Sequence, residues 1–212
     1  MLRAAGFSPI DNAAAVWLSD AAGKQRIEFM TPHRGTARSQ GRITAVEGRP
    51  GIGAVSLDGL QLLGRFTRKL ALPLRLPDGR LEVVRVTVPT LGAFLVGKAL
   101  TFMRRPADVD SPGHPKGAKD LLYIRDVMAA GPGVVAAVEA DLAAIVASEE
   151  PSVESAASNV YLALHGEASK YLQEAAAMLA ERELIQMTAA QRDLEGHITD
   201  LLEILRERSD SI

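Results

Sequence analysis

The sequence predicts an α+β fold that is followed by an all-helical C-terminal part. The first 130 residues contain short apolar segments bounded by glycine and proline turns, which is typical of strands, and two longer helical segments. From residue 131 onwards apolar residues recur every three or four positions, which is the spacing of helices. We therefore expect an α+β domain over 1–130 and a helical region over 131–212.

The composition is that of a globular chain with little net charge. Of 212 residues, 47% are hydrophobic and 24% are charged, and 24 basic against 26 acidic residues leave a net charge of −2. Bulk nucleic-acid binding is therefore not expected, although a local basic patch is compatible with this balance. The chain has no cysteine, which excludes disulfides, thiolate zinc sites and cysteine nucleophiles.

The sequence shows neither a membrane span nor a targeting signal. No apolar run reaches the roughly 18 residues that a bilayer requires. The N-terminal segment MLRAAGFSPI lacks the basic-then-apolar layout of a signal peptide. We therefore expect a cytoplasmic protein that has no membrane partner.

Two hairpins are predicted in the α+β part. The first joins strands at 13–19 and 25–30, and the second joins strands at 70–76 and 81–88. Each pair is separated by a turn that contains glycine, and Pro77-Asp78-Gly79 is the clearer of the two signals.

The segment between the two hairpins is rich in glycine. Gly48, Gly51 and Gly53 suggest a phosphate-binding loop, but Pro50 interrupts the run and no lysine followed by serine or threonine comes after it. We favour a flexible connection over 33–54, with a short strand at 42–46.

A helix is predicted from Thr90, as its cap, to Arg105. Its buried stripe is expected to contain the apolar residues Leu91, Phe94, Leu95 and Phe102. Lys98 falls inside this stripe, so its ammonium either extends to water or meets an anion. Both interpretations stay open on the residues alone.

A proline-rich loop over 106–116 precedes a second helix over 117–130. Asp108 and Asp110 form a D-x-D pair, but metal-holding pairs of this type project from a rigid strand, so a solvated turn is the better interpretation. Asp120, near the start of the helix, complements the helix dipole on the simplest interpretation.

The C-terminal region is predicted to be several antiparallel helices. Its breaks are expected at Gly133, Pro151 and Gly166 and at a capping box formed by Thr188 with Gln191. A heptad-like seam follows, made of Leu194, Ile198, Leu201 and Leu205. The seam packs on neighbouring helices, which we favour, or on a second copy of the chain.

Four segments of the chain carry a resemblance to a known family. They are LRAAGF (2–7), RIEFMTP (26–32), LVGKALTFMRR (95–105) and KGAKDLLYIRD (116–126). Through them residues 1–130 resemble bacterial nucleotidyltransferase-like proteins of the polymerase-β-type superfamily, which includes AbiEii-type toxins of toxin–antitoxin systems. The resemblance implies a mixed sheet with flanking helices. It also implies transfer of a nucleotide from a nucleoside triphosphate to a hydroxyl acceptor with two Mg²⁺ ions.

The resemblance assigns roles to five residues. Glu28 corresponds to the family's third catalytic acid and would hold metal. Lys98 and Arg105 would face the triphosphate of the bound nucleotide. Lys119 and Asp120 would belong to a second cluster in the same pocket.

The sequence departs from this family at one point. The G-S and D-x-D segment of the family lies upstream of the equivalent of LRAAGF, so the predicted sheet is incomplete and we expect this chain alone not to transfer nucleotides. The alternative is a non-catalytic interaction module whose helical tail binds a partner protein or a second copy.

Overall fold

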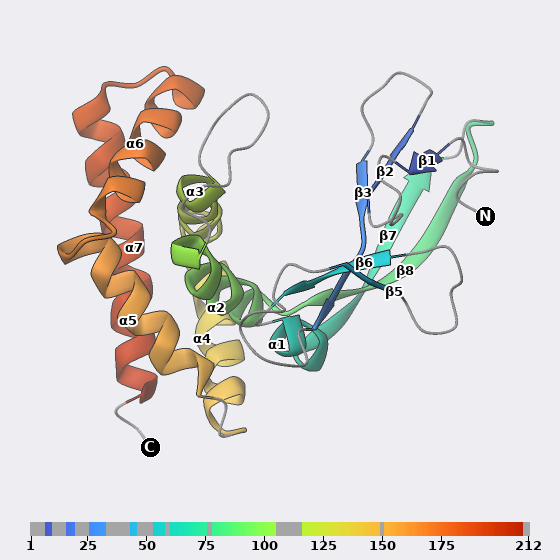
Figure 1. Cartoon of the computed structure of the whole chain (residues 1–212), viewed down its shortest axis with the longest axis horizontal. Helices are drawn as coiled ribbons and strands as arrows, with labels where there is room; N and C mark the ends of the chain where they lie inside the picture. Colours follow the sequence, from blue (N-terminus) through green and yellow to red (C-terminus); the bar gives the residue numbers. More distant parts are fainter. Residues whose placement is uncertain are drawn as a thin grey trace. The chain divides into compact units, whose positions relative to one another are not determined.

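The structure is a computed structural model of the whole chain. It describes residues 7–9, 16–19, 26–32, 43–45, 53–57, 60–75, 78–104, 116–148 and 151–209. These residues are mostly helical and include small β-sheets, an α+β layout as the sequence predicts (Figure 1). Their contacts define two compact units, 1–61 and 62–212, each of which has its own architecture.

The first unit contains an antiparallel sheet in the order β1 (Phe7–Pro9), β2 (Val16–Ser19) and β3 (Arg26–Glu28). Trp17 pairs with Ile27 across β2 and β3, so the first predicted hairpin is confirmed with shorter strands. Its turn over 20–23 lies outside the described residues.

A second sheet in this unit has the order β4 (Met30–Pro32), β6 (Gly53–Leu57) and β5 (Ile43–Ala45). Strand β5 confirms the short strand predicted at 42–46. The predicted strand at 25–30 divides at Phe29, and its last residue begins β4 in this other sheet.

Strand β6 corrects the prediction that 33–54 is only a connection. It begins at Gly53, pairs in parallel with β4, and buries Ala54. Val55 and Leu57 alternate with the smaller Ala54 and Ser56, which is the period of a strand, but the preceding glycines obscured this pattern. Gly48 and Gly51 lie beyond the part of the chain that the structure describes.

A short helix, α1 (Leu60–Arg65), contains the residue at which the second unit begins, Leu62, and was not predicted from the sequence. Its six residues are too few for a helical period to be recognised. The hairpin of β7 (Thr67–Arg75) and β8 (Leu81–Pro89) follows and confirms the second predicted hairpin. Gly79, with φ of +85°, lies between the strands, where its missing side chain avoids a steric penalty.

Six α-helices and one 3₁₀ turn make up the rest of the described chain. They are α2 (Leu91–Thr101), η3 (Phe102–Arg104), α3 (Lys116–Met128), α4 (Pro132–Val146), α5 (Ser152–His165), α6 (Ser169–Glu183) and α7 (Met187–Ser209). The predicted helices over 90–105 and 117–130 are thereby confirmed. Thr90 caps α2 as predicted, because its side chain accepts a hydrogen bond from the Ala93 amide at 3.4 Å.

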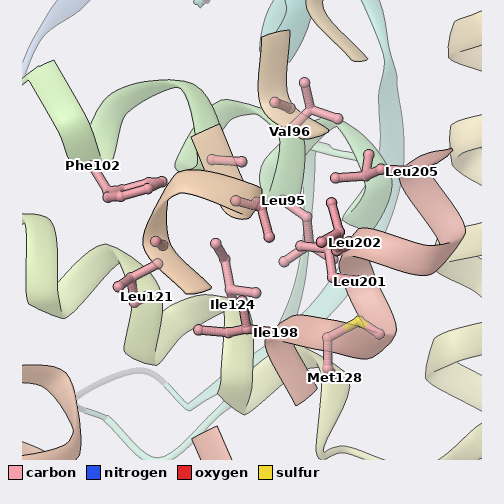
Figure 2. Packing of buried hydrophobic residues seen from close by; sticks show 14 of the residues in the cluster. Leu95, Val96, Phe102, Leu121, Ile124, Met128, Ile198, Leu201, Leu202 and Leu205 are labelled. Atoms are coloured by element: carbon pink, nitrogen blue, oxygen red, sulfur yellow. The ribbon is translucent and has the colours of Figure 1, made fainter. Parts of the chain in front are cut away.

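The prediction of a helical tail is also confirmed. Helices α4 to α7 form a packed group in which α5 and α6 both lie against α7 (Figure 1). The predicted seam of Leu194, Ile198, Leu201 and Leu205 is fully buried. Figure 2 shows Ile198, Leu201 and Leu205 among residues of α2 and α3. The seam therefore packs within the chain.

Two of the predicted helix ends are less accurate than the helices themselves. Helix α7 begins at Met187, and the Gln191 amide donates to Glu195, so the predicted capping box with Thr188 is wrong. The break before α4 lies at Gly131, whose φ is +112°, rather than at Gly133.

The compact units do not divide at residue 130. Helices α2 and α3 pack against α4, α5, α6 and α7, so they belong to the same unit as the tail. A nucleotidyltransferase-like domain over 1–130 stays a prediction from the resemblance.

Within the described ranges, no single helix is both long and apolar enough to cross a membrane. The pair Gly117–Met128 and Pro132–Val146 meets that criterion only when its two helices, bent by 111°, are counted together. Leu121, Ile124, Leu142 and Ile145 of this pair are fully buried in the core, as is usual for the inner helices of a packed group.

Candidate functional site

Helix α2 is surrounded by other helices and is apolar on most of its surface. Leu95, Val96 and Ala99 have no exposed surface, and Phe102 just beyond the helix is equally buried. The predicted stripe is thus confirmed for Leu95 and Phe102, while Leu91 and Phe94 are partly buried. Lys98 is the charged residue in this apolar setting.

Lys98 forms an ion pair with Asp120 of α3. Its Nζ lies 2.6 Å from Asp120 Oδ1, and the side chains are 25% and 9% exposed, respectively. Asp120 is the one buried charged residue among those that the structure describes. The Thr101 hydroxyl lies 3.1 Å from Asp120 Oδ2, so both carboxylate oxygens have a partner within hydrogen-bonding distance.

Aromatic rings surround the same ammonium group. Lys98 Nζ lies 4.7 Å from the ring centroid of Tyr123 and 5.6 Å from that of Phe94. These two rings contact each other edge to face, with centroids 6.3 Å apart. The ring faces attract the cation and hold it near Asp120.

This geometry resolves the two interpretations of Lys98 that the sequence left open. The ammonium meets an anion, and that anion is a carboxylate of the same chain. It also corrects the interpretation of Asp120, which is the fifth residue of α3 and uses its carboxylate to join α3 to α2.

The predicted site residues are brought together only in part. Lys98 and Asp120 are in direct contact, and Lys119 Nζ lies 5.9 Å from the Tyr123 ring that also faces Lys98. Arg105, like the D-x-D pair at 108–110, lies outside the described residues. The backbone of Glu28 is in β3 of the first unit, so the predicted pocket shared by all five residues stays a prediction.

The described residues do not by themselves fit the magnesium ions that the resemblance implies. Within them, no group of three or more histidine, aspartate or glutamate side chains is placed to hold a metal ion. Asp120 is already engaged by Lys98 and Thr101. These side chains therefore define no reaction step that passes through a metal.

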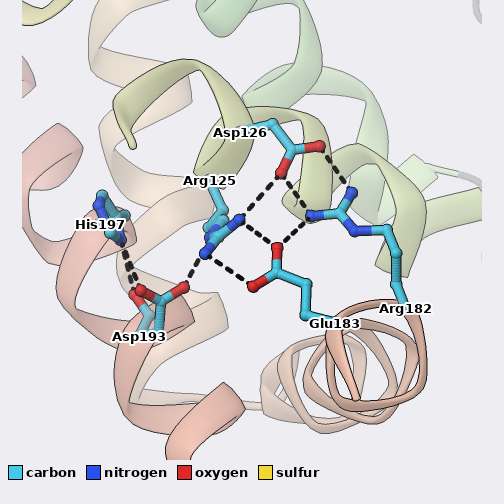
Figure 3. A network of polar contacts seen from close by, with 6 residues as sticks. All are labelled: Arg125, Asp126, Arg182, Glu183, Asp193 and His197. Atoms are coloured by element: carbon cyan, nitrogen blue, oxygen red, sulfur yellow. Dashed lines mark hydrogen bonds and ion pairs between the residues drawn. The ribbon is translucent and has the colours of Figure 1, made fainter. Parts of the chain in front are cut away.

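A second polar cluster, which was not predicted from the sequence, joins α3, α6 and α7 (Figure 3). Arg125 donates to Asp193 at 2.6 Å and to Glu183 at 2.8 Å, while both terminal nitrogens of Arg182 donate to Asp126 at 2.7 and 2.8 Å. These hydrogen bonds lower the pKa of Asp126 and raise the pKa of Arg182. The sequence feature that could have indicated this cluster is Arg125 itself, a cation on the apolar side of α3.

Two shallow cavities lie elsewhere in the second unit. One of about 200 Å³ is lined by Met103, Glu167, Ala168, Lys170 and Tyr171. Another of about 320 Å³ is lined by Leu122, Met178, Glu181 and Arg182. Neither cavity includes Lys98 or Asp120.

Comparison of the chain with protein-family models, with curated proteins and with solved structures finds no match. A function can therefore be inferred only from the residues themselves and their geometry.

Proposed function

We propose that the chain is a nucleotidyltransferase-like protein of the polymerase-β type, in which Lys98 contacts the phosphates of a nucleoside triphosphate and Asp120 positions that lysine. The observation that carries the proposal is the 2.6 Å ion pair between Lys98, in the apolar stripe of α2, and the almost fully buried Asp120 of α3.

Burial of this pair is costly, which favours a role beyond packing. Removing two charges from water costs several kcal/mol per ion, and a well-packed apolar pair of similar volume is often at least as stable. The ammonium has three donors and Asp120 accepts one of them, so donors remain for a phosphate.

The remaining parts of the proposed site come from the resemblance. Arg105 would join Lys98 on the triphosphate, and Glu28 would be a catalytic acid that holds Mg²⁺. Magnesium would neutralise the phosphates and activate the acceptor hydroxyl. The proposal for this chain concerns nucleotide binding.

A titration with fluorescent nucleoside triphosphates, with and without Mg²⁺, tests the proposal. Lys98→Met should weaken binding by about tenfold or more, since charge-assisted hydrogen bonds contribute roughly 1.5–3 kcal/mol. Lys170→Met is the matched control, because the Lys170 ammonium lies 5.0 Å from the Tyr171 ring in a similar cation–aromatic contact outside the site. Equal affinities for all three proteins, or no binding to the wild type, would contradict the proposal.

A second candidate function, a protein-interaction module formed by the helical tail, is favoured by one observation. Leu184, between α6 and α7, is 92% exposed and has a left-handed backbone with φ of 54°. Glycine is the usual residue at such a helix end, so this leucine costs stability without any burial in return. Ile185 and Met187 beside it are also exposed, at 38% and 40%. The three form an apolar tip that a partner protein would cover.

Leu184→Gly separates this candidate from the first. Glycine suits the backbone at this position, so the variant should be as stable as the wild type or more stable. If the tip is a binding surface, the variant should lose a partner that co-purifies with the wild type, while its nucleotide affinity stays unchanged. Retention of every partner would exclude the tip as the contact.

A further inference from the structure

The charges of this chain are separated along its sequence. The β7–β8 hairpin, over 67–89, contains five basic and two acidic residues. Residues 90–212, which include the helices from α2 to α7, contain eleven basic and nineteen acidic residues. The hairpin is thus a local exception to the acidic character of the rest of its unit.

Three of the hairpin cations lie on one face of the two-stranded ribbon. In the register, Lys69 pairs with Thr87, Ala71 with Arg85, and Arg75 with Leu81. Because side chains alternate along a strand, Lys69, Arg75 and Arg85 share a face, and Lys69 and Arg75 are about 20 Å apart along β7. All three residues are exposed, and together they form the basic face of the hairpin.

The opposite face of the hairpin has a different character. It carries the apolar residues Leu70, Leu72, Leu74, Val84, Val86 and Val88, four of which are half-buried. This face also carries the exposed Arg68 and Glu82, whose charges are opposite. The basic face is the more exposed of the two and has no acidic residue.

Within the described residues, the cations of the basic face differ in their partners from three cations of the helices. Lys98, Arg125 and Arg182 each bind a carboxylate. By contrast, no acidic side chain in the described part of the chain pairs with Lys69, Arg75 or Arg85. Three cations on one exposed face, with no counter-charge among the residues that the structure describes, favour a ligand that supplies several negative charges in a row.

We propose that the basic face of the β7–β8 hairpin binds the phosphate backbone of double-stranded DNA. Residues 67–89 contain no aromatic side chain, whereas proteins that bind single strands stack bases on aromatic rings. The major groove of B-DNA, about 12 Å wide, accepts a two-stranded ribbon, while the deep and narrow major groove of duplex RNA does not admit side chains. A second copy of the hairpin is disfavoured, because two basic faces repel each other.

Fluorescence anisotropy with the full chain and a labelled DNA duplex tests this proposal. A duplex of about 20 base pairs is roughly twice the ~30 Å length of the ribbon. In a plot of the logarithm of the binding constant against the logarithm of the salt concentration, three phosphate contacts predict a slope of about −3. A variant with Lys69→Gln, Arg75→Gln and Arg85→Gln should bind about tenfold more weakly or worse and lose most of this slope.

Two variants keep the test independent of folding defects. Arg80→Gln removes a cation from the hairpin turn that is already paired with Asp78 at 2.7 Å, so it should leave both affinity and slope nearly unchanged. Arg75→Lys with Arg85→Lys preserves the charges and should preserve the slope, because phosphate contact requires charge rather than the guanidinium shape.

Three outcomes would overturn the proposal. The first is that the chain does not bind the DNA duplex at about 50 mM salt, where phosphate contacts are strong. The second is that the folded triple variant keeps the salt dependence of the wild type. The third is that the chain binds single-stranded DNA, duplex RNA or an acidic protein more tightly than the DNA duplex. Because the assay contains no nucleoside triphosphate, its result is independent of whether Lys98 binds one.

Discussion

Arg125 on α3 donates a hydrogen bond to Asp193 on α7 at 2.6 Å, and the same guanidinium donates to Glu183 at the end of α6 at 2.8 Å. One side chain thus joins α3 to α6 and α7, and its two partners lie 58 and 68 residues further along the chain (Figure 3). Arg125 is the most buried member of this cluster, with 14% of its side chain exposed.

Replacing Arg125 by methionine should lower the free energy of unfolding by roughly 2 kcal/mol, because the variant leaves Asp193 without its arginine and Glu183 with Arg182 alone. Urea unfolding measures the loss. Arg192→Met, at a neighbour of Asp193 on α7 that lies outside the cluster, is the control and should change stability by less than about 0.5 kcal/mol. Similar effects of both substitutions would show that the cluster does not join the helices energetically.

The pKa of Asp126 gives this cluster a defined dependence on pH. The hydrogen bonds from Arg182 lower this pKa below its ordinary value of 3.8, so the native protein binds the proton less readily than the unfolded chain. The stabilisation is therefore present above pH 3.8 and is lost as the pH falls through the lower, native value. When the pH is lowered from neutral to below 3.8, Asp126→Asn should lose less of its free energy of unfolding than the wild type. Urea unfolding at each pH measures both losses. Parallel losses in the two proteins would contradict this assignment.

Much of the fold could be predicted from local patterns. The alternation in β7 and β8, the Thr90 cap of α2 and the apolar period of the tail all involve neighbouring residues, whose effect does not depend on the rest of the structure. Strand β6 was not predicted because it pairs with β4, more than twenty residues away, and because the glycines at its start and just before it resemble a loop.

The candidate site could be predicted only in part for the same reason. Lys98 was identified because a cation inside an apolar stripe conflicts with the helical period. Its partner Asp120 lies 22 residues away, and only the packing of α2 on α3 decides that their side chains meet. The family resemblance selected the same two residues, but neither the helical periodicity nor the composition of the sequence could predict that they contact each other.

The contact between α2 and α4 is so close that it requires a glycine. A β-carbon at Gly92 would lie 2.6 Å from the β-carbon of Asp141 and 3.0 Å from the backbone nitrogen of Leu142. The Asp141 carboxylate accepts a hydrogen bond from the Gly92 amide at 3.0 Å, so separating the helices would also lose this bond.

Gly92→Ala should therefore destabilise the protein by about 1–3 kcal/mol, the usual cost of overpacking. Gly196→Ala in the middle of α7 is the matched control, since nothing lies within 4 Å of the added carbon. It should stabilise the protein by roughly 0.5–1 kcal/mol through helix propensity. Thermal unfolding of the two variants should thus shift in opposite directions. A stabilised Gly92→Ala would show that the two helices are not in close contact.

The buried seam of α7 predicts a loss of stability rather than a change of oligomeric state. Leu201 has no exposed surface, and Leu201→Ala should cost about 2–5 kcal/mol by leaving a cavity in the core. Sedimentation should give the same mass for the variant and the wild type at concentrations where both are folded. Leu184→Ala, at an exposed leucine beside the same helix, is the control and should change neither property by much. If Leu201→Ala instead converted a dimer to a monomer without loss of stability, the seam would be an interface between two copies of the chain.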